Sequence, residues 1–461
     1  EPITEVSETV DCDVLIIGGG YSGCSCACNA AQNGLNTVLV EKDDVLNGHG
    51  VGGTGAIKSR VMDENGVVLD KPIEMERWVA TCGNRCNEAL IAQYMARSGE
   101  AADWLCEAGE KHHCSIPWAI LLDPTSACNL HCTGCWAAEY GNKLNLSFDE
   151  IDDIIRQGKE MGIYMYIYTG GEPLVRKKDL IRLCEKHDDC IFLCFTNATL
   201  IDEAFADEML RVRNFVPAIS LEGDEAATDG RRGQGTYRKV IRAMELLHER
   251  KLLYGISSCY TSANYDSITS EEYYDQLIRM GAYFIWYFHY MPVGNDAAPE
   301  LLPSPEQRET VYRRIRKLRA EKPLFAMDFQ NDAEYVGGCI AGGRRYLHAN
   351  GDVDPCVFIH YSNANIREVS LLEALQSPIF MAYHDNMPFN DNMMRPCPML
   401  ENPEKLRAMV AETGAHSTDP QSPETAEHLC AKCDGYAACW KPEADRLWAE
   451  RQAEKAARAG K

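Results

Sequence analysis

Three cysteines, Cys128, Cys132 and Cys135, are spaced CX3CX2C in the run Cys-Asn-Leu-His-Cys-Thr-Gly-Cys. Thiolates this close in sequence can bind three irons of a [4Fe–4S] cluster and leave the fourth iron without a protein ligand. Because a structural cluster takes four cysteines, a set of three indicates that a substrate or cofactor completes the coordination. Two alternatives stay open from these residues alone: chance clustering in a cysteine-rich chain, and a zinc site without its fourth ligand.

Further candidate binding residues follow the triplet, each near the end of an expected strand. The run Gly170-Gly171-Glu172-Pro173 would let backbone carbonyls approach a ligand closely, while Glu172 offers an acceptor to a cationic amine. Later come Asn197, then Ser220 and Glu222, then Arg232, whose planar guanidinium can pair with a carboxylate. The structural alternatives are a simple turn, a helix cap at Asn197 and a surface ion pair at Arg232.

The stretch from about 111 to 300 alternates strand-like and helix-like segments, which predicts a parallel α/β layout. Six such units indicate an open, partial (β/α)6 barrel, in which chemistry sits at the C-terminal ends of the strands. The expected strands are Trp118–Asp123, Tyr164–Tyr168, Ile191–Phe195, Val216–Leu221, Leu253–Ser258 and Tyr283–Tyr290. The expected helices include Phe148–Met161, Lys178–Lys186, Glu203–Arg211, Arg238–Lys251, Ser270–Met280, and later Pro305–Arg319 and Pro442–Ala457. The cysteine triplet follows the first strand, where that rule places it.

This middle segment resembles the core of radical S-adenosylmethionine (SAM) enzymes, on the triplet and the landmarks that follow it in order. In that superfamily a [4Fe–4S] cluster chelates SAM through its open iron and cleaves it to a 5′-deoxyadenosyl radical. The resemblance implies that the Gly170-Gly171-Glu172-Pro173 run contacts the methionine amino group. It also implies SAM contacts for four later residues: Asn197, Ser220, Glu222 and Arg232.

Residues 1–110 show a different pattern. Gly18, Gly20 and Gly23 follow a strand-like run, and a second run ends at Glu41. This arrangement is typical of a dinucleotide-binding, Rossmann-like βαβ unit, with a pyrophosphate on the helix N-terminus and the acid on a ribose. The segment resembles the N-terminus of FAD-dependent fumarate-reductase-type flavoproteins, which implies FAD. That family needs several hundred further residues to close its FAD pocket, so a truncated segment that binds no flavin is the alternative.

The segment from about 301 to 461 is rich in cysteines. Their spacings are CX11GX4C, then one single cysteine, then CX2CX5C, formed by Cys339, Cys356, Cys397, Cys430, Cys433 and Cys439. The pattern resembles a SPASM-type auxiliary-cluster domain, an α+β domain of radical SAM enzymes that modify peptides and proteins. It departs from that family at Glu443, where a further cysteine is expected. Six thiolates cannot fully ligate two cubanes, so we expect one auxiliary cluster or two with an open site. A zinc site at Cys397 and the last three cysteines is the alternative.

Composition narrows the partners. A chain of 461 residues predicts two or three domains, and a net charge of −23 disfavours nucleic acid and anionic membranes. No apolar run is long enough to span a bilayer. The 21 cysteines fit reduced cytoplasmic thiols and iron–sulfur ligation better than disulfides, although a chain that begins at Glu1 leaves an upstream targeting segment open.

The sequence therefore predicts an α/β protein in three segments: 1–110, 111–300 and 301–461. We expect a radical SAM enzyme that takes hydrogen from a peptide, protein or small-molecule substrate, with an electron donor such as flavodoxin or ferredoxin. The alternatives are an FAD-dependent oxidoreductase of the fumarate-reductase type, a non-catalytic iron–sulfur scaffold or electron carrier, and a hybrid in which flavin feeds the cluster. No particular oligomeric state is predicted.

Overall fold

The computed structural model describes residues 109–340, 345–419 and 421–459, together with Glu107 and two short N-terminal strands. These two strands are β1 (Val14–Ile17) and β2 (Thr37–Val40), which pair in parallel with Val14 opposite Thr37. They are the strands expected to flank the glycine-rich loop. The predicted flavin contacts themselves, Gly18, Gly20, Gly23 and Glu41, lie outside the described residues.

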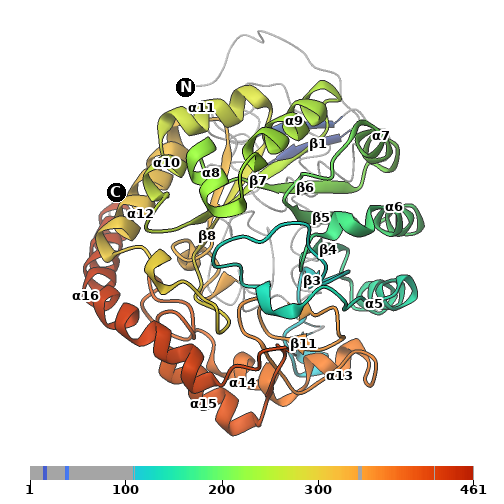
Figure 1. The fold of residues 1–461 in the computed structure, drawn as a ribbon. Helices are drawn as coiled ribbons and strands as arrows, with labels where there is room; N and C mark the ends of the chain where they lie inside the picture. Colours follow the sequence, from blue (N-terminus) through green and yellow to red (C-terminus); the bar gives the residue numbers. More distant parts are fainter. Residues whose placement is uncertain are drawn as a thin grey trace, which may run out of the picture.

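A curved sheet of nine strands organises the rest of the described chain (Figure 1). Its order is β11-β10-β3-β4-β5-β6-β7-β8-β9, and every neighbouring pair is parallel except β10 with β11. The strands are β3 (Ile120–Leu122), β4 (Met165–Tyr168), β5 (Ile191–Thr196), β6 (Phe215–Ser220), β7 (Gly255–Tyr260), β8 (Phe284–His289), β9 (Phe325–Asp328), β10 (Arg345–Leu347) and β11 (Val353–Asp354). The six predicted strands are β3 to β8. The last three strands come from beyond residue 300, so the third predicted segment shares the sheet of the second.

Helices cover the outer face of this sheet, and local signals explain where they begin. Ser147 and Glu150 form a reciprocal capping box at the start of α5, and Ile151, Ile154 and Ile155 make its buried face. The covering helices are α5 (Phe148–Glu160), α6 (Lys177–Lys186), α7 (Glu203–Val212), α8 (Glu225–Arg232), α9 (Thr236–Glu249), α10 (Tyr265–Ile268), α11 (Glu271–Met280) and α12 (Pro305–Glu321). Short 3-10 turns are η1 (Ala138–Tyr140), η2 (Pro173–Arg176), η3 (Pro299–Leu301) and η4 (Ala333–Tyr335).

The remaining elements follow the sheet and lie along one side of it (Figure 1). They are β12 (Tyr361–Ser362), α13 (Leu371–Leu375), α14 (Pro378–Asn386), α15 (Pro403–Thr413), β13 (His416–Ser417) and α16 (Ala426–Ala459). The last helix was expected to begin at Pro442, but it begins sixteen residues earlier and continues through that proline. No helix in the described part of the chain combines the length and the apolar character needed to cross a bilayer.

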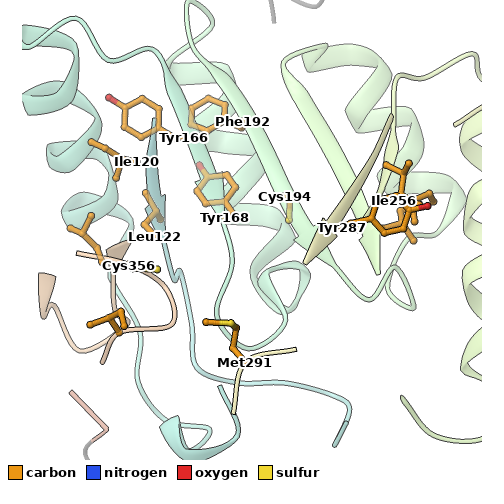
Figure 2. Close-up of a cluster of buried hydrophobic side chains, with 14 of the residues drawn as sticks. Ile120, Leu122, Tyr166, Tyr168, Phe192, Cys194, Ile256, Tyr287, Met291 and Cys356 are labelled. Atoms are coloured by element: carbon orange, nitrogen blue, oxygen red, sulfur yellow. The ribbon is translucent and has the colours of Figure 1, made fainter. Parts of the chain in front are cut away.

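Strand alternation divides the core into two layers. Ile120 and Leu122 face the helices, where Tyr168 and Phe192 stack with ring centroids 5.5 Å apart (Figure 2). Leu121, between them, belongs to the second layer inside the curve of the sheet. Successive residues of a strand point to opposite faces, so each strand supplies one side chain to the helices and the next to the interior.

A buried ion pair links the last helix, α16, to α12. Arg308 on α12 and Glu401 are both fully buried, with 2.6 Å between Nη1 and Oε1. The Arg308 guanidinium also lies 4.2 Å from the ring centre of Trp440 on α16. Glu401 accepts a hydrogen bond from the backbone N–H of Cys397 through its other oxygen. One arginine therefore fixes α12, α16 and the loop that carries Cys397.

Candidate active site

The cysteine triplet lies in the loop between β3 and α5, and all three thiols are partly exposed. Burial raises the pKa of the Cys128 thiol to about 11, and it raises the pKa of Cys132 against the opposing effect of Arg232. The Cys128 thiol is also influenced by Cys135 and Cys132, and the Cys132 thiol by Cys135, so the pKa values of the three thiols are linked. A neutral thiol loses its proton when a metal binds, which makes cluster loading depend on pH.

The Gly170-Gly171-Glu172-Pro173 turn follows β4 and packs directly on the start of the cysteine loop. A Cβ on Gly171 would stand 2.3 Å from the carbonyl oxygen of Ala127, so only glycine fits. The backbone N–H of Glu172 donates to that same carbonyl at 2.8 Å. The turn and the cysteine loop are therefore held together backbone to backbone.

The carboxylate of Glu172 accepts three hydrogen bonds from groups of the protein itself. It accepts hydrogen bonds from Leu174 N, Thr196 Oγ1 and Asn197 N at 3.0, 2.6 and 2.8 Å. These bonds tie the end of β4 to the end of β5. The sequence suggested that this carboxylate faces a cationic amine, whereas in the structure both of its oxygens hold neighbouring strand ends.

Asn197 also links elements of the site. Its side-chain N–H2 donates to Asn129 Oδ1 at 2.9 Å, and its oxygen accepts from the backbone N–H and the hydroxyl of Thr199. Asn129 lies next to Cys128 in the triplet loop. Asn197 thus supports the cysteine loop and does not cap a helix, the structural alternative open from the sequence.

Glu222, after β6, is fully buried between two arginines of α8. Its Oε1 lies 2.7 Å from Arg231 Nη1 and 2.5 Å from Arg232 Nη2. Although burial raises the pKa of this carboxyl, the two guanidinium groups hold it below its ordinary value. Arg232 was expected to meet a ligand carboxylate. In the structure its fork is occupied by Glu222, and its remaining Nη1 lies 4.0 Å from the sulfur of Cys132.

A cavity of about 140 Å³ lies inside the curve of the sheet, beside the cysteine loop. Ser220, Arg232 and Cys356 line it among the predicted residues, and Gly134, between two of the cysteines, reaches it from the loop. Residues that sequence reasoning missed make up most of its wall: Thr169, Phe195, Arg231, Ser257, Cys259, Phe288, Phe329 and Tyr346. Several of them, such as Phe195 and Phe288, stand at or near the last residue of an expected strand, which is the signal that could have identified them.

A chain of buried polar groups adjoins this cavity. The hydroxyl of Tyr346 donates to Asp123 and lies 3.3 Å from that of Tyr140, which in turn is 2.8 Å from His360 Nε2. His360 Nδ1 lies 2.9 Å from Asp419. Burial raises the pKa of Asp123 well above its usual range. The network therefore joins the end of β3 to the third segment through buried groups.

A second, smaller cavity of about 20 Å³ brings together three of the predicted auxiliary cysteines, Cys339, Cys356 and Cys397. It shares Met291, Phe329, Cys356 and Phe358 with the larger cavity, so the two are neighbours. Tyr383 also lines it, and burial together with four thiols, those of Cys356, Cys397, Cys339 and Cys430, raises the pKa of its hydroxyl. Three of these thiols, those of Cys339, Cys356 and Cys397, line the cavity together with Tyr383.

The other three auxiliary cysteines lie on a continuous helix, α16. Cys430 and Cys433 are one turn apart and buried, whereas Cys439 is exposed. At 100° per residue, Cys439 is half a revolution away from Cys430 around the helix. The CX2CX5C run therefore does not gather its three thiols on one face.

The residues present fit iron–sulfur clusters better than single ions. No three His, Cys, Asp or Glu side chains in the described ranges converge as the ligands of one metal ion do. That geometry does not supply the tetrahedral set a zinc ion would need at Cys397, Cys430, Cys433 and Cys439. A cubane makes a different demand, since each thiolate binds a different iron. Cys128, Cys132 and Cys135 offer three soft, partly exposed donors on a loop whose Gly134 lines the cavity, which is compatible with a cubane.

Comparison with known proteins agrees with this geometry. Residues 122–261 match the family model of the radical SAM superfamily, and residues 13–144 match that of an FAD binding domain. An uncharacterized protein of Archaeoglobus fulgidus is 28% identical over 51% of this chain, a match that spans about half (56%) of that protein's length. An AdoMet-dependent heme synthase of Nitratidesulfovibrio vulgaris is 25% identical, covering 56% of this chain and 77% of the relative.

Two further proteins cover more of the chain. The PqqA peptide cyclase of Gluconobacter oxydans is 24% identical over 66% of this chain and 90% of its own. The crystal structure of Streptococcus suis SuiB bound to S-adenosylmethionine superposes with a TM-score of 0.55 at 20% identity, covering 73% of this chain and 84% of SuiB. That likeness concerns the fold. Together with the family match, the parallel strands β3 to β7 and the triplet loop identify residues 122–261 of this chain as a radical SAM domain, the catalytic domain of a superfamily of enzymes.

Proposed function

We propose that the chain cleaves SAM reductively at a [4Fe–4S] cluster held by Cys128, Cys132 and Cys135, and takes hydrogen from a peptide substrate. When bound, the cluster supplies the electron that breaks the sulfur–carbon bond of SAM and releases a 5′-deoxyadenosyl radical. One observation carries the proposal: the loop of the three cysteines contributes Gly134 to the wall of a cavity that is otherwise built largely from the ends of the parallel strands. Such strand ends are where barrels of this type place their chemistry.

The residues proposed for SAM binding are of two kinds: those that would touch SAM and those that hold the cysteine loop and Arg232 in position. Ser220 lines the cavity and offers a hydroxyl, and backbone groups of the Gly170-Gly171-Glu172-Pro173 turn lie against the cysteine loop. Glu172 and Asn197 act by fixing that loop, because their side chains bond within the protein. Glu222 positions Arg232 near Cys132, where a positive charge favours the thiolate.

We further propose one auxiliary cluster at the second cavity. Cys339, Cys356 and Cys397 line it, and Cys430 is the candidate fourth ligand because it shares the surroundings of Tyr383. Cys439 is excluded from this role by its exposure on the far side of α16.

A peptide substrate is supported by relatives of this chain, since the Gluconobacter enzyme is a peptide cyclase. We propose a one-electron donor such as flavodoxin or ferredoxin, and a cytoplasmic setting that keeps the thiols reduced.

The test is anaerobic. The full chain is reconstituted with iron and sulfide, mixed with SAM and dithionite, and assayed for 5′-deoxyadenosine by mass spectrometry. We expect product from the unmodified chain and none from Cys128→Ala. Cys190→Ala is the matched control, because this buried thiol lies just before β5, outside the site, and its loss should leave product formation intact. A reconstituted chain with its full iron content that forms no 5′-deoxyadenosine would refute the proposal.

Iron content tests the auxiliary cluster separately. Cys397→Ser should lower the iron bound per chain by up to four atoms, while Cys439→Ser should change nothing. Mössbauer spectra of both variants would report the clusters directly. Equal losses in the two variants would place the exposed cysteine among the ligands and contradict the single-cluster arrangement.

An FAD-dependent oxidoreductase is the second candidate function, because residues 13–144 match an FAD binding domain and β1 pairs in parallel with β2. If this segment holds flavin, the purified chain should show flavin absorbance that Gly20→Val removes, since a side chain there would block the pyrophosphate. Flavin-dependent reduction of the cluster would support the hybrid in which flavin supplies electrons.

A further inference from the structure

We propose that the apolar part of the large cavity binds an uncharged aromatic side chain of the peptide substrate. The inference rests on the proposed function, since it names the part of the substrate that enters the same site. It concerns the wall formed by Phe195, Phe288 and Phe329, which we call the aromatic wall.

The aromatic wall is a continuous surface of rings. Phe288 and Phe329 stack with centroids 4.3 Å apart, and Phe195 meets Phe288 edge to face at 5.6 Å. Trp286 packs against two of these rings, with centroid distances of 5.7 Å to Phe195 and 5.5 Å to Phe329. The rings come from β5, β8 and the residue after β9, so rigid strands fix their positions. A wall of fixed rings suits a flat partner, because aromatic pairs prefer defined stacked or edge-to-face geometries.

A second set of rings faces the cavity from the cysteine loop and the third segment. Trp136, next to Cys135, lies edge-on to Tyr346 at 5.9 Å and to Phe358 at 6.2 Å. All three line the same cavity. A side chain that enters here is therefore surrounded by rings contributed by two parts of the chain, beside the loop that carries the triplet.

The aromatic wall itself offers no charge to a substrate. Of the residues that line the cavity, only Arg231 and Arg232 carry a full charge, and they share the single buried carboxylate of Glu222, which leaves one net positive charge at the α8 side of the cavity. His289 is held neutral, because burial and Arg308 lower its pKa well below the usual range, and both ring nitrogens have partners. A carboxylate or ammonium group placed against the aromatic wall would lose its hydration without a counter-charge. The substrate group that fits is therefore uncharged.

Adenine of SAM is the rival occupant, since it too is flat and uncharged. Three small hydroxyl residues of the cavity, Thr169, Ser220 and Ser257, lie at the end of β4, on β6 and on β7, whereas Phe288 and Phe329 lie on β8 and just after β9. They offer the hydroxyls that a nucleoside requires, whereas the aromatic wall offers none. This division assigns the polar side to SAM and the aromatic wall to the substrate.

The experiment measures binding and not turnover. The reconstituted full chain is loaded with SAM, and equilibrium dialysis gives the affinity for N-acetyltryptophanamide and for N-acetylglutamate amide. We expect the tryptophan probe to bind at least tenfold more tightly. Phe329→Leu keeps an apolar side chain but removes a ring, and should weaken the tryptophan probe about twofold to tenfold. Tyr283→Ala, an aromatic residue that is 47% exposed outside the cavity, is the matched control and should change neither affinity.

Two results would overturn the inference. Equal binding of the two probes would show that the cavity does not select against charge. A Phe329→Leu variant that binds SAM more weakly, but the tryptophan probe unchanged, would assign the aromatic wall to adenine. A second variant, Phe288→Leu, repeats the comparison on the other ring of the stack. Selective binding of the tryptophan probe without 5′-deoxyadenosine formation would contradict the proposed function and leave this inference standing. Formation of 5′-deoxyadenosine without selective binding would overturn this inference and leave the proposed function standing.

Discussion

Replacing Glu222 by glutamine should destabilise the protein strongly, because it removes the buried carboxylate that pairs with two largely buried arginines. The side chain of Glu222 is 0% exposed, and those of Arg231 and Arg232 are each 14% exposed. Removing one partner of a buried ion pair costs about 3–5 kcal/mol of folding free energy. Glutamine keeps the volume and one acceptor oxygen, so we expect the lower end, about 3 kcal/mol, or roughly 6 °C in the unfolding temperature.

Glu225→Gln is the matched control for this loss. Glu225 pairs with Arg238 at 2.9 Å on the surface, where their side chains are 49% and 80% exposed. Exposed pairs contribute about 0–1 kcal/mol, so this variant should unfold within about 2 °C of the unmodified chain. Both substitutions remove one negative charge from neighbouring positions, so a difference between them reports burial and pairing.

Thermal unfolding followed by circular dichroism at several pH values provides the assay. The folded-state pKa of Glu222 lies below its ordinary value of 4.5, so its stabilising effect is complete above that pH and is lost as the pH falls further. The gap between the Glu222→Gln variant and the unmodified chain should therefore be constant near neutrality and narrow below about pH 4.5. If the two glutamine variants unfold at the same temperature near neutral pH, the reasoning about the buried ion pair is wrong.

Two other substitutions test the backbone contact and the buried acid. Gly171→Ala should lower iron content and 5′-deoxyadenosine formation sharply, because its Cβ would meet the Ala127 carbonyl oxygen at 2.3 Å. Gly230→Ala in α8 is the control: its Cβ would meet no atom within 4 Å, and the change should raise helix stability by up to about 1 kcal/mol. Equal iron content in the two variants would contradict this reasoning. Asp123→Asn should flatten the pH dependence of the unfolding free energy above about pH 4. The folded chain keeps a proton on Asp123 that the unfolded chain releases, so the stability of the unmodified chain falls as the pH rises above that value. If unfolding free energies from urea titrations across pH 4–8 change with pH equally in both proteins, Asp123 is not protonated in the folded chain.

Much of the sheet could be predicted because its strands are continuous apolar runs between helix signals. The run from Ile191 and the run from Tyr283 both became strands within one or two residues of the expected bounds. Parallel strands that are buried on both faces need such runs. The helices carry equally clear signals, such as the Ser147 N-cap at the start of α5. The radical SAM match rests on this same region, which explains why the fold class could be inferred from the sequence.

The extra strands and the long last helix could not be predicted for physical reasons. β10 and β11 contain three and two residues, too few for any periodicity to appear. The helix was expected to begin at Pro442 because proline ordinarily ends a helix. Buried packing of Trp440 and Leu447 on either side of it stabilises the continuous helix instead.

The location of the candidate site could be predicted from the sequence, but the partners of its side chains could not. The spacing of the triplet located the loop, but the sequence gives no sign that Arg232 would pair with Glu222 or that Glu172 would hold Thr196. The Glu172–Thr196 contact depends on how the ends of β4 and β5 are staggered, and the Glu222–Arg232 contact on how α8 turns back toward the end of β6; spacing along the chain encodes neither. The aromatic wall also depends on the stagger of strand ends, because its three rings come from strands that are far apart in sequence.

The pairing of β10 with β3 also has a consequence for the order of synthesis. Asp123 and Tyr346 form their hydrogen bond across 223 residues of sequence. At roughly 5–20 residues per second, a ribosome needs about 10–45 s to make that stretch. Throughout this interval the β10-facing edge of β3 is uncovered, and the cysteine loop that follows β3 has no third segment packed beside it. The nascent chain thus passes through a stage in which Trp136, next to Cys135, still lacks the rings of Tyr346 and Phe358 that pack against it in the finished protein.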